Sequence, residues 1–385
     1  MSGIVLSQSV RQNLLSLQST SALLATTQND LATGNKVNTA LDNPTNYFTA
    51  QGLNSRADSI SSLLDGIGNG VQVLQAANAG ITSLQSLVAT AKSIANQVLQ
   101  TTVGYSPKSS TTSTTTVGTA ANLVDGVNIA SGNTLTIAAT AGGTATNITF
   151  TANESLDQLN AALAPNNVSA SLNAAGKLVF TTTNDAASST LGAVGGTAAA
   201  FTGVAAAAAP VADPASQAIR SNLVSQYNNI IAQITTTAQD SSFNGINLLN
   251  GDNLKLTFNE TGKSTLTING TDASATGLGL APLVSGTNFL DNNSANSVLT
   301  ALSNANSSLQ TEASTLGSNL SIVQIRQDFS KNLINVLQTG ASNLTIADPN
   351  EEAANSQALA TRQSIAVSAL ALANQSQQSV LQLLR

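Results

Sequence analysis

Residues 60–95, ISSLLDGIGNGVQVLQAANAGITSLQSLVATAKSIA, repeat apolar side chains at intervals of seven residues. One column of this repeat consists of Ile60, Ile67, Leu74, Ile81 and Val88. A second column begins with Leu64 and Val71 and continues into Asn78. Such spacing predicts a helix paired along its length with another helix, and about forty residues of it span about 60 Å. Two interpretations of Asn78 are open, because a polar residue in the seam either fixes the register or occupies a partly exposed position.

The same spacing returns near both ends of the chain. In the first helix it is carried by Val10, Leu17, Leu24 and Leu31, with Leu14 between the first two. Towards the other end it is carried by Leu302, Leu309, Leu316 and Val323. The last stretch, ALALANQSQQSVLQLLR (residues 369–385), has helical apolar spacing and no charge before its final arginine. Because an amphipathic helix buries its apolar stripe, we expect the helices of the two ends to pair with each other.

Turn and capping residues divide the helical segments. Gly34-Asn35 is expected to end the first helix, and Asp42-Asn43-Pro44 to form a turn before the long one. Further helices are predicted to begin at Asp213-Pro214 and Asp348-Pro349, because aspartate is a preferred N-cap and proline a preferred first residue. The apolar face of the helix from Pro214 is expected to contain Ile219, Leu223, Tyr227, Ile230 and Ile234.

The middle of the chain differs from its ends in composition and in apolar spacing. YSPKSSTTSTTTVGTA, residues 105–120, is of low complexity and is interpreted as a linker. Alternating apolar residues then predict two strands on each side of a short helix at ESLDQLNAALA, residues 154–164. The order strand-strand-helix-strand-strand predicts a small α+β domain between about residues 121 and 203. A β-hairpin is predicted near residues 254–268.

The composition limits what such a chain can do. Charged residues make up 8% of the 385 residues, against about 25% in typical domains, and the formal net charge is −6. An acidic chain without a basic stripe argues against a nucleic-acid-binding surface. The chain has no histidine and no cysteine, which excludes the usual zinc sites and nucleophile–base pairs. We expect no secretory signal at the N-terminus and no membrane span, because no basic segment followed by a long apolar run is present.

The remaining polar residues predict no catalytic, metal or cofactor site. The acidic groups Asp125/Asp157 and Asp348/Glu351/Glu352 are interpreted as helix caps and solvated charges. The glycine pairs at 142–143 and 195–196 are interpreted as turns, because neither opens a helix after a strand as a phosphate-binding loop does. We therefore expect a protein that is not an enzyme.

Four motifs together resemble the bacterial flagellin family. The run QSTSALLATTQNDLATGNKVNTALDNPTNYFTAQGLNSRADSI has the family's succession of helix, break and helix. SSFNGINLLNG resembles the motif before the family's hairpin, and TLGSNLSIVQIRQDF resembles its long C-terminal helix around Leu316-Gly317. ANQSQQSVLQLLR resembles its terminal signature. The order and placement of these motifs are specific, and the resemblance covers about residues 1–103 and 213–385.

The resemblance implies a mainly α fold, in which both chain ends build a long antiparallel helical bundle with coiled-coil packing, with a small β-hairpin region and an inserted α+β outer domain. Residues 1–43 and 344–385 are expected to form an inner tube, whose self-assembly contacts come from Val10, Leu14, Leu17, Leu24, Leu31, Leu370, Val380 and Leu384. Residues 44–103 and 212–343 are expected to form a rod packed by Ile60, Ile67, Leu74, Ile81, Val88, Leu302, Leu309, Leu316 and Val323. Residues 104–211 are expected to form the surface-exposed insert, although insertions in the family more often follow the hairpin.

The resemblance also implies partners. The chain is expected to be secreted through the flagellar type III export apparatus with an export chaperone, and to polymerise with itself into the extracellular filament used for swimming. Filament cap and hook-associated proteins are further expected partners, whereas nucleic acid, membrane insertion and cofactors are not expected. Many flagellins carry an Arg and a Glu where a vertebrate Toll-like receptor binds. Thr90 and Ser93 stand there in this chain, so we expect weak activation of that receptor.

Two other functions remain open from the sequence alone. A hook–filament junction protein shares the helical ends but occurs in few copies and forms no long filament by itself. A secreted adhesin or glycan-binding protein would use the insert at residues 104–211 as its binding module.

Overall fold

The computed structural model describes residues 8–383, leaving aside the side chains of residue 377 and residues 380–383. Contacts divide the chain into two compact units. The described part of the first unit is residues 8–68, 256–266 and 323–383, and the second unit is residues 69–255 and 267–322. Each unit has an apolar cluster of its own.

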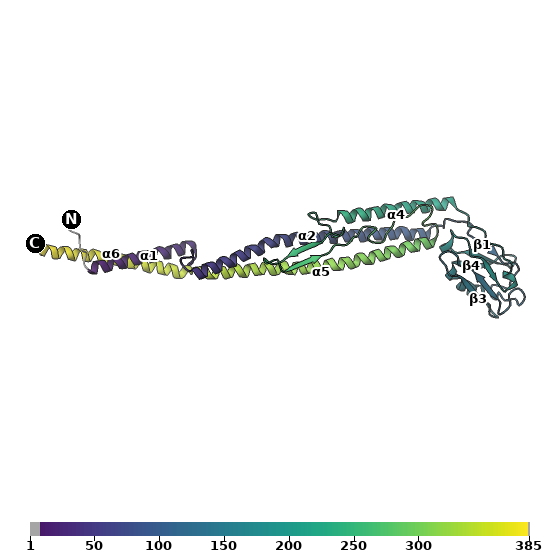
Figure 1. The fold of residues 1–385 in the computed structure, drawn as a ribbon, viewed down its shortest axis with the longest axis horizontal. Helices are drawn as coiled ribbons and strands as arrows, with labels where there is room; N and C mark the ends of the chain where they lie inside the picture. Colours follow the sequence, from purple (N-terminus) through teal and green to yellow (C-terminus); the bar gives the residue numbers. More distant parts are fainter. Residues whose placement is uncertain (1–7, 384–385) are drawn as a thin grey trace. The chain divides into compact units, whose positions relative to one another are not determined.

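In the first unit the terminal helices α1 (Gln8–Thr33) and α6 (Pro349–Leu383) lie side by side and run in opposite directions (Figure 1). The backbone N–H groups of Lys36 and Val37 donate to the carbonyl of Thr345 at 2.7 and 3.3 Å, which places the end of α1 beside the start of α6. Gly34 ends α1 with a φ of 72°, a left-handed conformation that favours glycine. The expected break at Gly34-Asn35 and the pairing of the two ends are confirmed.

The two long helices, α2 (Pro44–Gln100) and α5 (Asn292–Thr345), contribute residues to both units. In the first unit a cluster of Ala57, Ile60, Ile334 and Leu337 joins them. The register interpretation of Asn78 is wrong, because Asn78 is exposed and Ala77 takes the buried position. An ideal helix repeats every 3.6 residues, so the buried side drifts away from a strict seven-residue column.

The second unit contains α4 (Pro214–Asp240), which starts where it was predicted. Its buried face differs from the prediction, because Ile219 is half exposed whereas Arg220 and Ile231 are buried. Apolar spacing alone gives no indication of a buried arginine. At the other end of α4 the chain comes close to α2, since a Cβ atom on Gly80 would collide with the side chains of Ser241 and Leu249. The predicted hairpin is confirmed as β7 (Leu254–Thr257) paired with β8 (Thr265–Ile268).

The insert contains two three-stranded antiparallel sheets around one core (Figure 1). The first sheet has the order β1 (Ser110–Thr112), β5 (Leu178–Thr182) and β4 (Val168–Leu172). The second has the order β3 (Thr146–Thr149), β2 (Thr134–Ile137) and β6 (Val194–Gly196). Helix α3 (Leu156–Leu163) is followed by 3-10 turns at Ala164–Asn166, Asn184–Ala186 and Ala199–Phe201. The strand-strand-helix-strand-strand core is confirmed, with β1 and β6 added to it.

The predicted linker is wrong for the residues around β1. Ser109 and Thr111 are buried, and their hydroxyls donate to the carbonyls of Ala208 and Ala205 at 2.6 and 2.8 Å. Because the backbone accepts from both hydroxyls, Ser and Thr face the interior without an unpaired polar group. Their low-complexity sequence lacks the apolar alternation that normally reveals a strand.

Two short segments connect the insert to the helices. Tyr105 pairs with Ala212 in an isolated antiparallel bridge. The N–H of Ser106 donates to the carbonyl of Val211, and the N–H of Val211 donates to the carbonyl of Pro107, both at 2.9 Å. Residues 104–107 and 211–213 are termed the neck.

The predicted fold class is confirmed, with mainly helical structure, paired ends and an inserted α+β domain. Within residues 8–383, none of the helices has the length and apolar character that crossing a membrane requires.

Candidate assembly interface

The terminal pair, α1 with α6, buries few large side chains between its helices. The buried residues of α1 are Val10, Thr20, Thr27 and Asp30. Leu17 and Leu24 are half-buried, as is Leu370 on α6. Because hydrophobic stabilisation scales with the apolar area removed from water, this contact by itself stabilises the pair only weakly.

Among the side chains of the terminal pair that the structure describes, seven large apolar ones are exposed to solvent. They lie on several sides of the two helices, and we term them together the outward apolar face: Leu14, Leu15, Leu23, Leu31, Ile365, Val367 and Leu372. Their exposed fractions range from 37% for Leu14 to 70% for Leu372. Exposed apolar side chains gathered on one element are typical of a protein interaction surface.

Few charges accompany the outward apolar face. Helix α1 contains only Arg11 and Asp30, and α6 contains Glu351, Glu352 and Arg362. The two glutamates lie in the first turn of α6, where the positive end of the helix dipole stabilises them. The surface therefore carries little charge that would repel a like-charged surface.

The end of α1 holds a carboxyl group that binds its proton unusually well. Burial raises the pKa of Asp30, and the negative charge of Asp42 raises it further. The amide of Asn38 donates to Oδ1 of Asp30 at 3.2 Å and opposes this shift. In contrast, the backbone N–H groups of Thr39 and Asn38 donate to Asp42 and lower the pKa of that carboxyl. Of the two acids, Asp30 takes up a proton first.

The eight residues expected in the inner tube occupy different environments. Val10 is buried, Leu17, Leu24 and Leu370 are half-buried, and Leu14 and Leu31 are exposed. The side chain of Val380 and the whole of Leu384 lie outside the described residues.

The nine residues expected to pack the rod are at most 2% exposed, and they are Ile60, Ile67, Leu74, Ile81, Val88, Leu302, Leu309, Leu316 and Val323.

Both terminal helices lie in regions that match known protein families. The bacterial flagellin N-terminal helical region matches residues 5–118, and the bacterial flagellin C-terminal helical region matches residues 299–384. Together the two matches cover about half of the chain. This chain belongs to the bacterial flagellin family.

Individual flagellins from three organisms are similar to this one. Flagellin FljM from Caulobacter vibrioides is 32% identical over 165 residues, which are 42% of this chain and 59% of that protein. A flagellin from Brucella melitensis is 28% identical over 181 residues, 44% of this chain and 64% of that protein. Flagellin A from Rhizobium meliloti is 40% identical over 73 residues, 19% of this chain and 18% of that protein. The chain thus spans less than two thirds of the length of these curated flagellins.

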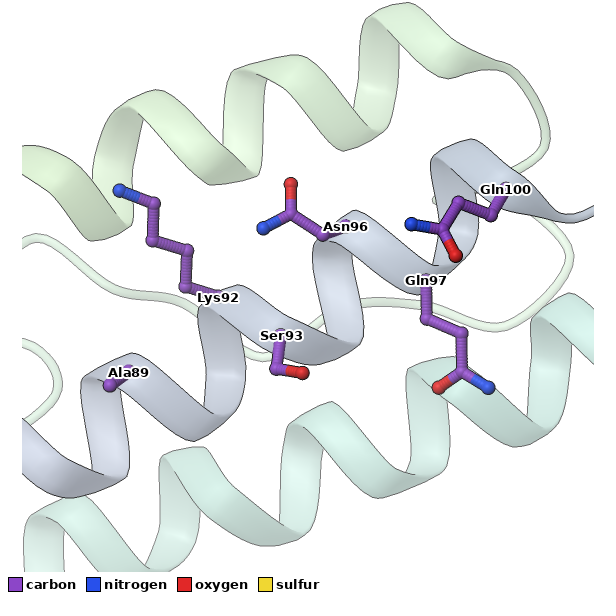
Figure 2. Close-up of a pocket in the computed structure, with 6 residues that line it drawn as sticks. All are labelled: Ala89, Lys92, Ser93, Asn96, Gln97 and Gln100. Atoms are coloured by element: carbon purple, nitrogen blue, oxygen red, sulfur yellow. The ribbon is translucent and has the colours of Figure 1, made fainter.

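The positions compared with the receptor site of other flagellins lie on α2. Thr90 is exposed, and its hydroxyl donates to the carbonyl of Ser86 at 2.9 Å. Ser93 lines an open cavity of about 520 Å³ together with Ala89, Lys92, Asn96, Gln97 and Gln100. Figure 2 shows Lys92 and Asn96 pointing toward α5 and Gln97 pointing toward α4. Lys92 is the only charged residue lining this cavity, and its ammonium group donates to Ser303 Oγ at 3.3 Å.

Several positioned residues of this flagellin were missed by sequence reasoning. At the tip of the hairpin, Arg56 Nε lies 2.8 Å from Glu260 Oε1, and Arg326 stands 5.6 Å from the ring centre of Phe258. The chain has only 13 Lys and Arg residues, and this rarity was the one feature of the sequence that could have drawn attention to Arg56 and Arg326. Among the described residues, no three His, Cys, Asp or Glu side chains gather closely enough to hold a metal ion.

Proposed function

We propose that this flagellin is a structural subunit that polymerises into the flagellar filament used for swimming, and that it performs no chemical reaction. The observation that carries the proposal is the outward apolar face of the terminal pair. A single copy leaves this face in water, whereas neighbouring copies in a polymer would cover it. Membership of the flagellin family supports the same function.

The mechanism is assembly driven by burial of apolar surface. The terminal pair alone gains little from its own contact, because Val10 is the only large apolar residue that is fully buried among the side chains described in it. When copies pack around it, burial of the outward apolar face adds free energy that offsets the cost of ordering the helices. A surface that contacts a different surface of the next copy builds an open helical polymer rather than a closed ring.

The proposal assigns different segments of the chain to different parts of the filament. Residues 1–43 and 344–385 form the inner tube, residues 44–103 and 212–343 form the rod, and residues 104–211 form the domain exposed to the medium. Export through the flagellar type III apparatus with a chaperone, and contacts with cap and hook-associated proteins, belong to the same proposal. Its location is the extracellular part of the flagellum.

The experiment that tests the proposal is polymerisation of the purified full chain, induced by salt or by filament seeds and viewed by negative-stain electron microscopy. We expect long filaments of uniform width. A chain lacking residues 370–385 should remain a monomer with unchanged helices in the rod, because it loses much of the terminal pair. Persistent monomers or short stubs from the intact chain would contradict the proposal and favour a junction protein. Normal filaments from the truncated chain would contradict the assigned interface.

A further inference from the structure

Arg220 of α4 is completely buried, and its guanidinium group is bound by the backbone. Its Nε atom donates to the carbonyl of Thr102 at 2.7 Å, and Nη1 donates to the carbonyl of Phe289 at 2.5 Å. Nη2 donates to two carbonyls at the end of α2, those of Val98 at 3.1 Å and Thr101 at 2.9 Å. One side chain thus connects α4 with the end of α2 and with the segment that precedes α5.

A buried arginine is stable here because the end of a helix is a favourable place for a cation. The last carbonyls of α2 have no partner within the helix and carry partial negative charge. A planar guanidinium group presents several N–H donors in fixed directions, which a lysine does not. Losing those donors would leave the carbonyl of fully buried Phe289 without its Nη1 donor, and an unpaired buried group is costly. The carbonyl of Val98 would keep the N–H and the hydroxyl of Thr101 as donors, at 3.2 and 2.8 Å.

The same residues that surround Arg220 also bind the neck. Thr102 lies two residues before Gly104, whose N–H donates to the carbonyl of Leu290 at 3.0 Å. Gln217, one turn before Arg220, donates from its side chain to the carbonyl of Gly104 at 3.0 Å. The N–H of Asp213 donates to the same carbonyl of Gly104, also at 3.0 Å. Both strands of the neck are therefore attached to the helices that Arg220 joins.

A second connection runs directly from the insert to the start of α5. The hydroxyl of Ser188 donates to Oδ2 of Asp291 at 2.6 Å, and Oδ1 of Asp291 accepts from the N–H of Ser294 at 2.9 Å. Burial lowers the pKa of Arg220, and the negative charge of Asp291 opposes this shift. The insert is thus connected to the helices by its neck and by Ser188.

We propose that Arg220 is a positioning residue that fixes the neck to the ends of α2 and α5, so that the insert is carried as a rigid arm. The proposal concerns the single chain and does not depend on polymerisation. Without Arg220 the insert and the helices remain folded, because each has its own core, and the neck between them becomes mobile.

Hydrogen–deuterium exchange on the full-length monomer tests this proposal. In Arg220→Met, the protection of peptides covering 103–107 and 210–213 against exchange should fall by at least about tenfold. Opening the neck then breaks fewer hydrogen bonds and therefore costs less free energy. Peptides from the insert core around Phe150 and Phe180 should keep their protection. Arg220→Lys should show a smaller loss, since the charge remains and the fixed fork is lost. Lys331→Met, which removes an exposed charge elsewhere, is the matched control and should change nothing at the neck.

The distribution of distances between two spin labels measures how rigidly the insert is held on the helices. The chain has no cysteine, so cysteines introduced at exposed Thr149 in the insert and exposed Ser307 on α5 are the only labelled sites. We expect one narrow distance distribution in the parent and a broad one in Arg220→Met. Ser188→Ala should broaden the distribution while neck protection is retained.

Three results would overturn the proposal. One is unchanged neck protection in both Arg220→Met and Arg220→Lys. Another is loss of protection throughout the insert and the rod in Arg220→Lys, which would make Arg220 a general stabilising residue. The third is a distribution that is already broad in the parent chain.

Discussion

The outward apolar face makes a quantitative prediction about polymerisation. Leu15 on α1 and Leu372 on α6 are 67% and 70% exposed in the single chain. Leucine to alanine removes three carbon groups, each contributing about 0.8 kcal/mol when buried. Scaled by these exposed fractions, each substitution removes about 1.6 kcal/mol from contacts between copies. The double variant therefore loses about 3 kcal/mol per subunit, which raises the critical concentration for polymerisation about a hundredfold.

The assay is sedimentation of filaments grown from seeds at increasing protein concentration. The monomer should keep its helix content by circular dichroism, because alanine favours a helix at least as strongly as leucine. Val127→Ala, which removes apolar carbons from an 80% exposed position in the insert, is the control and should leave the critical concentration unchanged. A double variant that polymerises within about threefold of the parent would refute the assignment of this face, since that difference is only about 0.6 kcal/mol.

Three further predictions concern other parts of the chain. Gly80→Val should destabilise the monomer by about 2–3 kcal/mol, because its side chain has no room beside Ser241; urea unfolding measures this, and an unchanged midpoint contradicts it. The raised pKa of Asp30 means that its folded form holds the proton more tightly, so its contribution to stability is complete in acid and is lost as the pH rises through the folded pKa. Asp30→Asn should therefore melt at a higher temperature than the parent at pH 7 and at the same temperature in acid, and the opposite trend would exclude this effect. In a Toll-like-receptor reporter assay the chain should be weaker than a strong flagellin, and Thr90→Arg with Ser93→Glu should increase the signal; equal potency of the unaltered chain would refute the comparison.

The long helices could be predicted from sequence because their buried residues are apolar and periodic. Ile60, Ile67 and Leu74 follow one another at spacings that only a packed helix explains, and all three are buried. The same reasoning failed at Ser109 and Thr111, where hydroxyl groups replace apolar side chains and the backbone satisfies them.

The candidate interface was only partly predictable. A heptad column identifies which helices pair, but Leu31 is exposed while Val10 of the same column is buried. The side of a helix that packs within its own chain and a side that packs against other copies are both apolar. The sequence therefore does not distinguish the two. Arg220 was not predicted at all, because a cation bound by backbone carbonyls needs no acidic partner and leaves no pattern in the sequence.

The neck has a consequence for how such chains can change over evolution. Since Tyr105 and Ala212 are direct neighbours in an antiparallel bridge, the chain leaves the helices and returns to them at almost the same point. The intervening hundred or so residues can be exchanged for a shorter or longer segment without altering the spacing of α2 and α4, provided that the replacement ends in two adjacent strands. This position is therefore a natural site of modular exchange, at which the insert can diverge while the helices on either side of it stay the same.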